Sequence, residues 1–164
     1  MSAKLWTSLT PRNGTGLSNI LRQTEDMLMC LSPATIIVFN RKALKKFGGF
    51  GGAADSIRNR SDLENLSEYV EYAADMYGWD DIQKYCLAVY QIVKLHPFTD
   101  GNKRTAGYVL LNCLRKRGLS YTGREKNLAE QIIELVKTDP GKKEESVLNF
   151  SYFIKSRLQK RDIR

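Results

Sequence analysis

Histidine and cysteine are scarce in this sequence. There is a single histidine, His96, so a zinc site built from the usual histidine and cysteine ligands is not expected. The three cysteines are odd in number and show no Cys-x-x-Cys spacing. We therefore expect Cys30, Cys86 and Cys113 to be buried, reduced thiols that behave as small hydrophobic side chains.

Long hydrophobic runs are also missing. The most apolar stretch, residues 27–39, contains Ser32 and Pro33 and is shorter than the roughly 20 residues that a membrane-spanning helix needs. The first residues do not follow the pattern of a secretory signal, because Pro11 and Asn13 interrupt any apolar run. We expect a cytoplasmic protein with no membrane partner.

The composition is that of an ordinary globular domain. The 164 residues are 42% hydrophobic and 27% charged, which argues against intrinsic disorder and is enough for one buried core. The net charge of +8 favours anionic partners such as nucleotides, nucleic acids or acidic proteins. Basic clusters at the ends of expected helices, such as residues 115–117 and 157–164, also complement helix dipoles.

Hydrophobic periodicity predicts an all-α fold, a compact helical bundle. Apolar residues recur at helical spacing, and no segment sustains the alternation of a β-strand, although residues 119–122 could form a short extended piece. We expect an N-terminal extension over residues 1–30, irregular with one short helix, and a domain over 31–164. The expected helices of the domain cover approximately residues 32–47, 61–78, 80–95, 102–117, 128–136 and 147–158.

Three helix starts carry clear capping signals. Ser32 precedes Pro33, which suits the first helical position. The run Ser61-Asp62-Leu63-Glu64 fits a capping box, and Asp80 with Gln83 matches the same pattern. The glycine-rich loop over residues 48–52 ends the first helix and is either a flexible linker or a flap with a function.

The chemically richest segment is the connector His96-Pro97-Phe98-Thr99-Asp100-Gly101-Asn102-Lys103-Arg104. An imidazole can be neutral near pH 7 and can take a proton from a hydroxyl, which makes His96 a candidate general base. Asp100 offers an oxygen ligand for Mg²⁺, which commonly takes one or two protein carboxylates together with phosphates; the alternative is a helix cap. Phe98 is expected to anchor the loop on the core.

The second half of this connector has the features of a phosphate site. Gly101 and Asn102 open a helix whose first amides are unpaired and attract phosphate oxygens. Lys103 and Arg104 are unfavourable beside the positive end of a helix dipole unless a polyanion binds there. The residues by themselves therefore predict a nucleotide phosphate site with a base and a metal ligand.

The segment from His96 to Arg104 resembles the signature of the Fic/Doc superfamily, His-Pro-Phe-x-Asp/Glu-Gly-Asn-Gly/Lys-Arg. The resemblance covers approximately residues 31–155. The segments that flank the motif are similar to those of the death-on-curing (Doc) branch. The resemblance implies an all-α fold and transfer of part of a nucleotide, with ATP and Mg²⁺, to protein hydroxyls. It also implies that the glycine loop is a flap that positions the target.

The resemblance assigns a role to each matching residue. His96 would be the catalytic base, Asp100 the magnesium ligand, and Arg104 a catalytic and phosphate-binding residue. Gly101, Asn102 and Lys103 would bind the phosphates beside Arg104.

Two positions distinguish the possible reactions. Lys103 stands where AMP-transferring members have glycine, and Gly107 stands where they have a second arginine. This pattern favours a Doc-like toxin, a kinase that moves the terminal phosphate of ATP to a hydroxyl of a target such as elongation factor Tu. Gly101 follows the AMP-transferring pattern, so Fic-type AMPylation is the alternative.

The sequence has no match to the inhibitory pattern Ser/Thr-x-x-x-Glu-Gly/Asn, which favours inhibition by a separate antitoxin. Two other interpretations remain: a degenerate member that only binds nucleotide, and a basic helical module that binds nucleic acid. Basic residues are spread over several helices without a nucleic-acid motif, so we do not expect a nucleic-acid partner.

Overall fold

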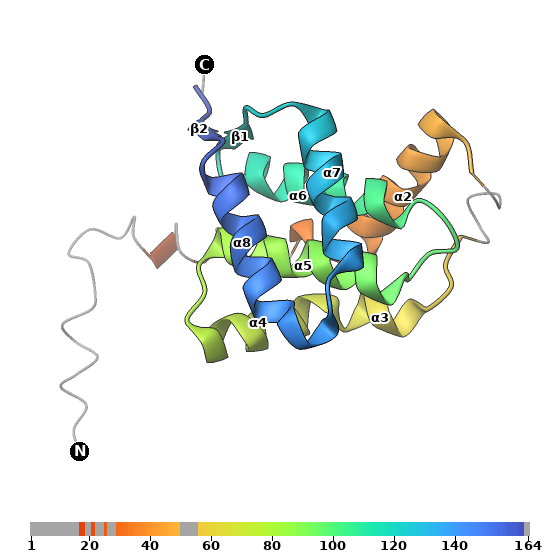
Figure 1. Cartoon of the computed structure of the whole chain (residues 1–164), viewed down its shortest axis with the longest axis horizontal. Coiled ribbons are helices and arrows are strands. Elements are labelled where there is room, and N and C mark those ends of the chain that lie inside the picture. Colours follow the sequence, from red (N-terminus) through yellow and green to blue (C-terminus); the bar gives the residue numbers. More distant parts are fainter. Residues whose placement is uncertain (1–16, 19–20, 22–24, 26–28, 50–55, 163–164) are drawn as a thin grey trace.

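The chain folds as an all-α bundle with one small β-ribbon, in a computed structural model that describes residues 17–18, 21, 25, 29–49 and 56–162 (Figure 1). The elements follow in this order: α2 (Pro33–Phe47), α3 (Arg60–Glu64), α4 (Leu66–Tyr77), α5 (Asp81–Leu95), α6 (Asn102–Lys116), β1 (Leu119–Tyr121), α7 (Glu125–Lys137), the 3₁₀ turn η1 (Pro140–Lys142), α8 (Lys143–Lys155) and β2 (Leu158–Lys160). None of the described helices has the length and apolarity needed to cross a membrane.

Helix α5 is the centre of the bundle. All its residues from Tyr85 to Val93 are buried, and it packs against α4, α6, α7 and α8. A helix that is buried around its whole circumference needs neighbours on every side. In Figure 1, α7 and α8 (blue) cross α5 on one side of the bundle. The loop that follows α5 is therefore attached to the most enclosed element of the fold.

Local capping fixes the starts of α2 and α5 as the sequence predicts. Ser32 Oγ accepts the Thr35 amide at 3.2 Å, with Pro33 as the first helical residue. Asp80 Oδ1 accepts the Gln83 amide at 2.9 Å, and Gln83 Oε1 accepts the Asp80 amide at 2.8 Å. Each cap satisfies amides that the first helical turn leaves unpaired.

The predicted capping box at Ser61 is wrong. Helix α3 begins one residue earlier, with Asn59 at the N-cap position, and Ser61 Oγ donates to Asn59 Oδ1 at 2.8 Å. The expected helix over 61–78 is also divided at Asn65, where α3 ends and α4 begins. Asparagine is a weak helix former, which is consistent with the break in the helix at this residue. Gly78 ends α4 in a left-handed conformation, as expected.

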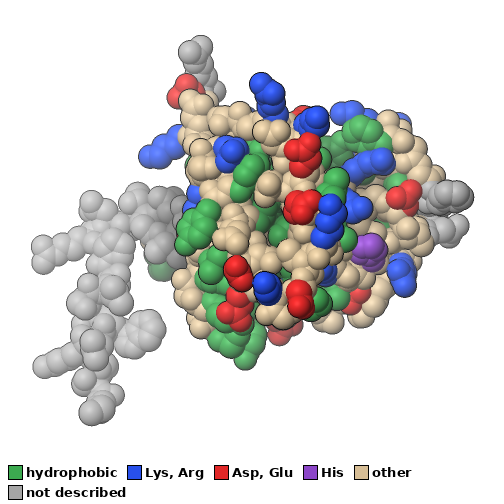
Figure 2. All heavy atoms as spheres, in the orientation of Figure 1, with side chains coloured by type: hydrophobic (Ala, Val, Ile, Leu, Met, Phe, Trp, Pro, Cys, Tyr) green, Lys and Arg blue, Asp and Glu red, His purple; other side chains and the backbone are tan. Residues whose placement is uncertain are grey.

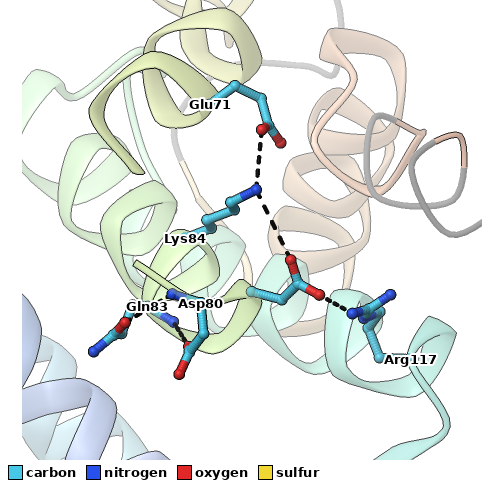
Figure 3. A network of polar contacts seen from close by, with 6 residues as sticks. Glu71, Asp80, Gln83, Lys84 and Arg117 are labelled. Atoms are coloured by element: carbon cyan, nitrogen blue, oxygen red, sulfur yellow. Dashed lines mark hydrogen bonds and ion pairs between the residues drawn. The ribbon is translucent and has the colours of Figure 1, made fainter. Parts of the chain in front are cut away.

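A charged network holds α4, α5 and the end of α6 together (Figure 3). Lys84 Nζ lies 3.0 Å from Glu71 Oε2 on α4 and 3.9 Å from Asp81 Oδ1, and Arg117 pairs with the other oxygen of Asp81. The Lys84 side chain is only 14% exposed, so solvent screens this network less than an open surface pair. It stabilises the end of the bundle remote from the start of α6.

The C-terminal segment is a strand and not the end of a helix. Helix α8 stops at Lys155, and β2 pairs antiparallel with β1 so that Leu119 lies opposite Lys160. The prediction that placed Leu158 on the last helix is therefore wrong, because its backbone pairs with β1. The expected extended piece near residues 119–122 is confirmed.

Two of the three cysteines form a disulfide, contrary to the prediction of reduced thiols. Cys30 and Cys113 are bonded, with their Cα atoms 5.3 Å apart, although 83 residues separate them in sequence. Both are buried. Cys86 is free and buried as expected, and burial raises the pKa of its thiol, so it stays protonated.

Several predictions fall in part outside the described residues. Leu17, Leu21, Glu25 and Met29 are helical, in agreement with a short N-terminal helix, whereas residues 19–20 and 26–28 are not described. Residues 50–55 of the glycine-rich loop are likewise outside the described range. The domain boundary after residue 30 stays a prediction.

Candidate functional site

The site begins where α5 ends. His96 is the C-cap residue of α5, with φ 50° and ψ 60°, and it is the one non-glycine residue with positive φ in the described chain. This left-handed conformation costs about 1–2 kcal/mol for a residue with a Cβ, so the surroundings must impose it. As predicted, Pro97 prevents the helix from continuing. The imidazole is exposed, and Figure 2 shows the histidine (purple) on the surface.

Backbone contacts with residues 56–59 fix the loop after His96. The Pro97 carbonyl accepts the amides of Arg58 at 2.7 Å and Asn59 at 3.1 Å. The Thr99 amide donates to the Ser56 carbonyl at 2.7 Å. This short segment therefore acts as a rigid support, and nothing in the sequence pattern of residues 56–59 indicated it.

Phe98 and Asn102 close the loop on the core. Phe98 is fully buried, which confirms its predicted role as an anchor. Asn102 Oδ1 accepts the Phe98 amide at 3.0 Å, and Asn102 Nδ2 donates to the Phe98 carbonyl at 2.9 Å. The sequence assigned Asn102 to phosphate binding. In the structure this side chain is hydrogen-bonded to the loop backbone. Its main-chain amide, in the first turn of α6, is therefore the group of Asn102 that could contact a phosphate.

Helix α6 starts immediately after this closure. Gly101 is the N-cap with φ 76°, and its carbonyl accepts the Thr105 amide at 2.9 Å, the first bond of the helix. Gly101 itself has no side chain that could cap this end. Helix geometry leaves the amides of Asn102, Lys103 and Arg104 without partners inside the helix, and such amides attract phosphate oxygens.

Asp100 lies just outside the helix and is not its cap. Its Oδ1 accepts the amide of Gly101 at 2.6 Å, whereas a capping side chain would accept an amide further into the first turn. The backbone of Gly49 passes close above it, since a Cβ on Gly49 would lie 2.8 Å from Asp100 Oδ2. Any residue larger than glycine at position 49 would displace this carboxylate.

Lys103 and Arg104 bring positive charge to the same place. Both are exposed, and the first turn of α6 has no acidic residue. The Arg104 guanidinium stacks over Phe47 at 4.8 Å from the ring centroid and donates weakly to the Gly48 carbonyl at 3.5 Å. Phe47, the last residue of α2, is half exposed and supports this arginine.

These groups surround one cavity. His96, Thr99, Asp100, Gly101 and the next three residues line a space of about 270 Å³. The structure thus brings together the predicted site residues around this cavity. Asp100 is the one acidic residue in the lining of this cavity, and the described residues contain no cluster of three acidic, histidine or cysteine side chains.

A second, mainly apolar groove adjoins the cavity. It has a volume of about 340 Å³ and shares Lys103 and Arg104 with the first cavity. Gly107 on α6 forms part of its wall, where an added Cβ would lie 3.5 Å from Ile132 Cδ1. Its other lining residues include Phe47, Tyr108, Leu111, Leu128, Ala129 and Ile133. Polar and charged residues thus line the cavity, and mainly apolar residues line the groove beside it.

Lys94 joins the end of α5 to the helix behind this groove. Its Nζ donates to the carbonyls of Val136 at 2.8 Å and Thr138 at 2.6 Å, at the end of α7. A lysine at a helix C-terminus satisfies terminal carbonyls and complements the dipole. The position of α7 is therefore tied to the residue two places before His96.

Fold and site together describe an all-α domain with a polar cavity at the start of α6. The sequence model of the Fic/DOC family matches residues 30–114, which is more than half of the 164 residues. The chain belongs to the Fic/DOC family. It is also similar to a protein of Caenorhabditis briggsae called protein adenylyltransferase fic-1, with 45% identity over 57 residues. That segment covers 34% of this chain and 11% of the nematode protein.

Proposed function

We propose that the chain transfers AMP from ATP to a hydroxyl group of another protein. The observation that carries the proposal is the single cavity in which His96, Asp100 and the open amides of α6 meet two cations. The nematode relative is named as an adenylyltransferase, and this favours AMP transfer over the phosphate transfer that the Doc-like sequence features predict.

In this reaction His96 takes the proton of the target hydroxyl. The hydroxyl oxygen forms a bond to the α-phosphorus, the bond from that phosphorus to the bridging oxygen breaks, and pyrophosphate leaves. The amides of residues 102–104 and the charges of Lys103 and Arg104 stabilise the phosphates as negative charge shifts during transfer. His96 is suited to the first role because its side chain is exposed to an incoming protein.

Asp100 is the proposed magnesium ligand. Its carboxylate lines the cavity beside the phosphate site, and a single carboxylate with phosphate oxygens suits Mg²⁺. Bound there, the cation would neutralise phosphate charge. The apolar groove would receive the nucleoside, because it shares Lys103 and Arg104 with the cavity.

Phosphate transfer is the second candidate reaction, and the position of Lys103 is the observation that favours it. The lysine adds bulk and charge between the cavity and the groove, which could reverse the bound nucleotide and present its γ-phosphate. A toxin of this kind would act on a protein such as elongation factor Tu and would be blocked by a separate antitoxin. These partners, and a cytoplasmic location, stay predictions.

Labelled ATP distinguishes the two reactions. The purified chain is incubated with Mg²⁺, a cell extract and ATP that carries its label on the α or the γ phosphate. Label transferred to protein only from the α position is the expected result, and label transferred only from the γ position would replace the proposal with phosphate transfer.

The control variants test the assignment of the base. His96→Ala should lower transfer by about 10²- to 10⁴-fold, as expected for loss of a general base. Tyr152→Ala changes an exposed side chain on α8 and should transfer at the wild-type rate. Transfer by His96→Ala at the wild-type rate would exclude His96 as the base.

A further inference from the structure

Asn40 is a buried polar residue on α2 that contacts the start of α6. It is fully buried and belongs to the helix that packs against α6. Its Nδ2 donates to the main-chain carbonyl of Asp100 at 2.9 Å and to Thr105 Oγ1 at 3.1 Å. A side chain 60 residues away in sequence therefore holds the loop that carries the proposed metal ligand.

Thr105 extends this contact to the next carbonyl. Its Oγ1 donates to the Gly101 carbonyl at 2.8 Å, so the chain of hydrogen bonds runs from Asn40 through Thr105 to Gly101. The Asp100 and Gly101 carbonyls belong to consecutive peptide groups. Holding both fixes the backbone angles of Gly101, at φ 76°, and with them the direction of the Asn102 amide.

The Asn40 side chain packs directly against the start of α6. A Cβ on Gly101 would lie 3.2 Å from Asn40 Nδ2, so the amide rests directly on the glycine that starts α6. Asn40 Oδ1 has no hydrogen-bond partner within the described part of the chain. A leucine at this position would leave the Asp100 carbonyl without this donor. The side-chain hydrogen bonds of Asn40 therefore go to the loop and to Thr105 at the start of α6.

We propose that Asn40 is a positioning residue that sets the Asp100 carboxylate and the first amide of α6 for Mg²⁺ and phosphate. This inference rests on the proposed function. Asn40 lies outside the cavity and acts through Asp100, Gly101 and Thr105. The two consecutive peptide groups would turn more freely without it, and the carboxylate and the amide would no longer face one ligand together.

The test compares Asn40→Leu with a matched variant on the same helix. Asn40→Leu keeps the number and branching of the side-chain heavy atoms and removes both hydrogen bonds, and Thr105→Val removes the hydroxyl between Asn40 and Gly101. Ile36→Ala truncates another fully buried side chain of α2 that has no hydrogen bond to the loop, and it controls for general destabilisation of that helix.

Amide hydrogen exchange of the ligand-free chain is the first measurement. Faster exchange at residues 101–105 in Asn40→Leu and Thr105→Val, but not in Ile36→Ala, is expected. Exchange in Asn40→Leu that equals wild type, or an equal increase in Ile36→Ala, would overturn the inference. This measurement needs no bound nucleotide, so it decides the role of Asn40 even if the proposed transferase activity fails.

Calorimetric titration with ATP, with and without Mg²⁺, is the second measurement. Asn40→Leu should bind ATP with Mg²⁺ about tenfold more weakly, and the benefit from Mg²⁺ should shrink, whereas Ile36→Ala should retain it. Unchanged binding by a folded Asn40→Leu would contradict the inference. Absence of ATP binding by the wild-type chain would instead contradict the proposed function.

Discussion

At the scale of single residues, the motif loop divides into side chains that face a ligand and side chains that build the loop. His96 and Lys103 are exposed, whereas Phe98 and Asn102 are buried. All four fall within one motif, in which the sequence predicts the buried position of Phe98 but not that of Asn102. Loss of a buried member should therefore change stability, and loss of an exposed member should change activity alone.

Asn102→Ala is expected to destabilise the chain by about 1–3 kcal/mol. The variant leaves the buried main-chain amide and carbonyl of Phe98 without their present partner, and an unpaired buried polar group costs about that much. Urea denaturation followed by circular dichroism measures the change. His96→Ala, with its exposed side chain, should stay within about 0.5 kcal/mol of wild type. Equal stability of Asn102→Ala and wild type would show that these two hydrogen bonds contribute nothing.

Sequence reasoning found most of the site residues but not the role of each one. His96, Asp100, Lys103 and Arg104 do line one cavity, because nine consecutive residues between two helices cannot spread far. The spacing could not show that the Asn102 amide turns back to Phe98. Asn40 was missed, although a polar residue between Ile36 and Ala43 on an apolar helix face is a signal that could have identified it.

At the scale of helices and strands, short-range caps were predictable and long-range pairings were not. The cap at Asp80 is formed by residues three positions apart, so the sequence contains all of it. The start of α3 depends on contacts between residues 56–59 and the loop after α5. These contacts join distant parts of the chain, so the local sequence pattern does not reveal them. For the same reason β2 was mistaken for helix, since its partner β1 lies far back in the chain.

Asp80 gives a prediction with a defined pH dependence. Burial raises its pKa, but hydrogen bonds from Lys155 and from the Gln83 amide outweigh burial and lower it below the usual 3.8. The ionised carboxylate therefore stabilises the folded state above pH 3.8, and this stabilisation is lost as the pH falls through the lowered folded value.

Asp80→Ala should lower the free energy of unfolding at pH 7 by about 1–2 kcal/mol, because α5 loses its N-cap and Lys155 loses its partner. The deficit should shrink as the pH falls below 3.8. Denaturation curves at a series of pH values measure it. Asp80→Asn keeps a capping oxygen and should show a smaller deficit at pH 7. A deficit for Asp80→Ala that does not change with pH would contradict the assigned role of the charge.

At the scale of the whole molecule, the disulfide connects the N-terminal part of the chain to α6, the helix that starts at the cavity. Cys30 lies just before α2, and Cys113 lies near the end of α6. The sequence could not predict the pair, because three cysteines without a characteristic spacing allow several pairings and only the fold brings these two together. Disulfides persist in oxidising surroundings, so the redox state of the protein decides whether this link exists.

Reduction of the disulfide should lower the free energy of unfolding by about 2–4 kcal/mol, since the bond restricts an unfolded chain over a long loop. Denaturation with and without a reductant measures the effect, and Cys30→Ser should reproduce it. Cys86→Ala keeps the disulfide and should remain sensitive to the reductant. Identical curves for oxidised and reduced wild type would show that the bond does not stabilise the fold.

The disulfide also has a mechanical consequence. It closes a covalent ring that contains α2 to α5, the motif loop and most of α6, so both chain ends lie outside the ring. Tension applied at either end passes through the sulfur atoms and bypasses the motif loop. An unfolding or translocating machine would first extend the segments outside the ring, and would then meet a closed loop that can enter a pore only as a doubled chain. The oxidised protein would therefore resist threading at Cys30 or at Cys113, whereas the reduced protein could be drawn through as a single strand.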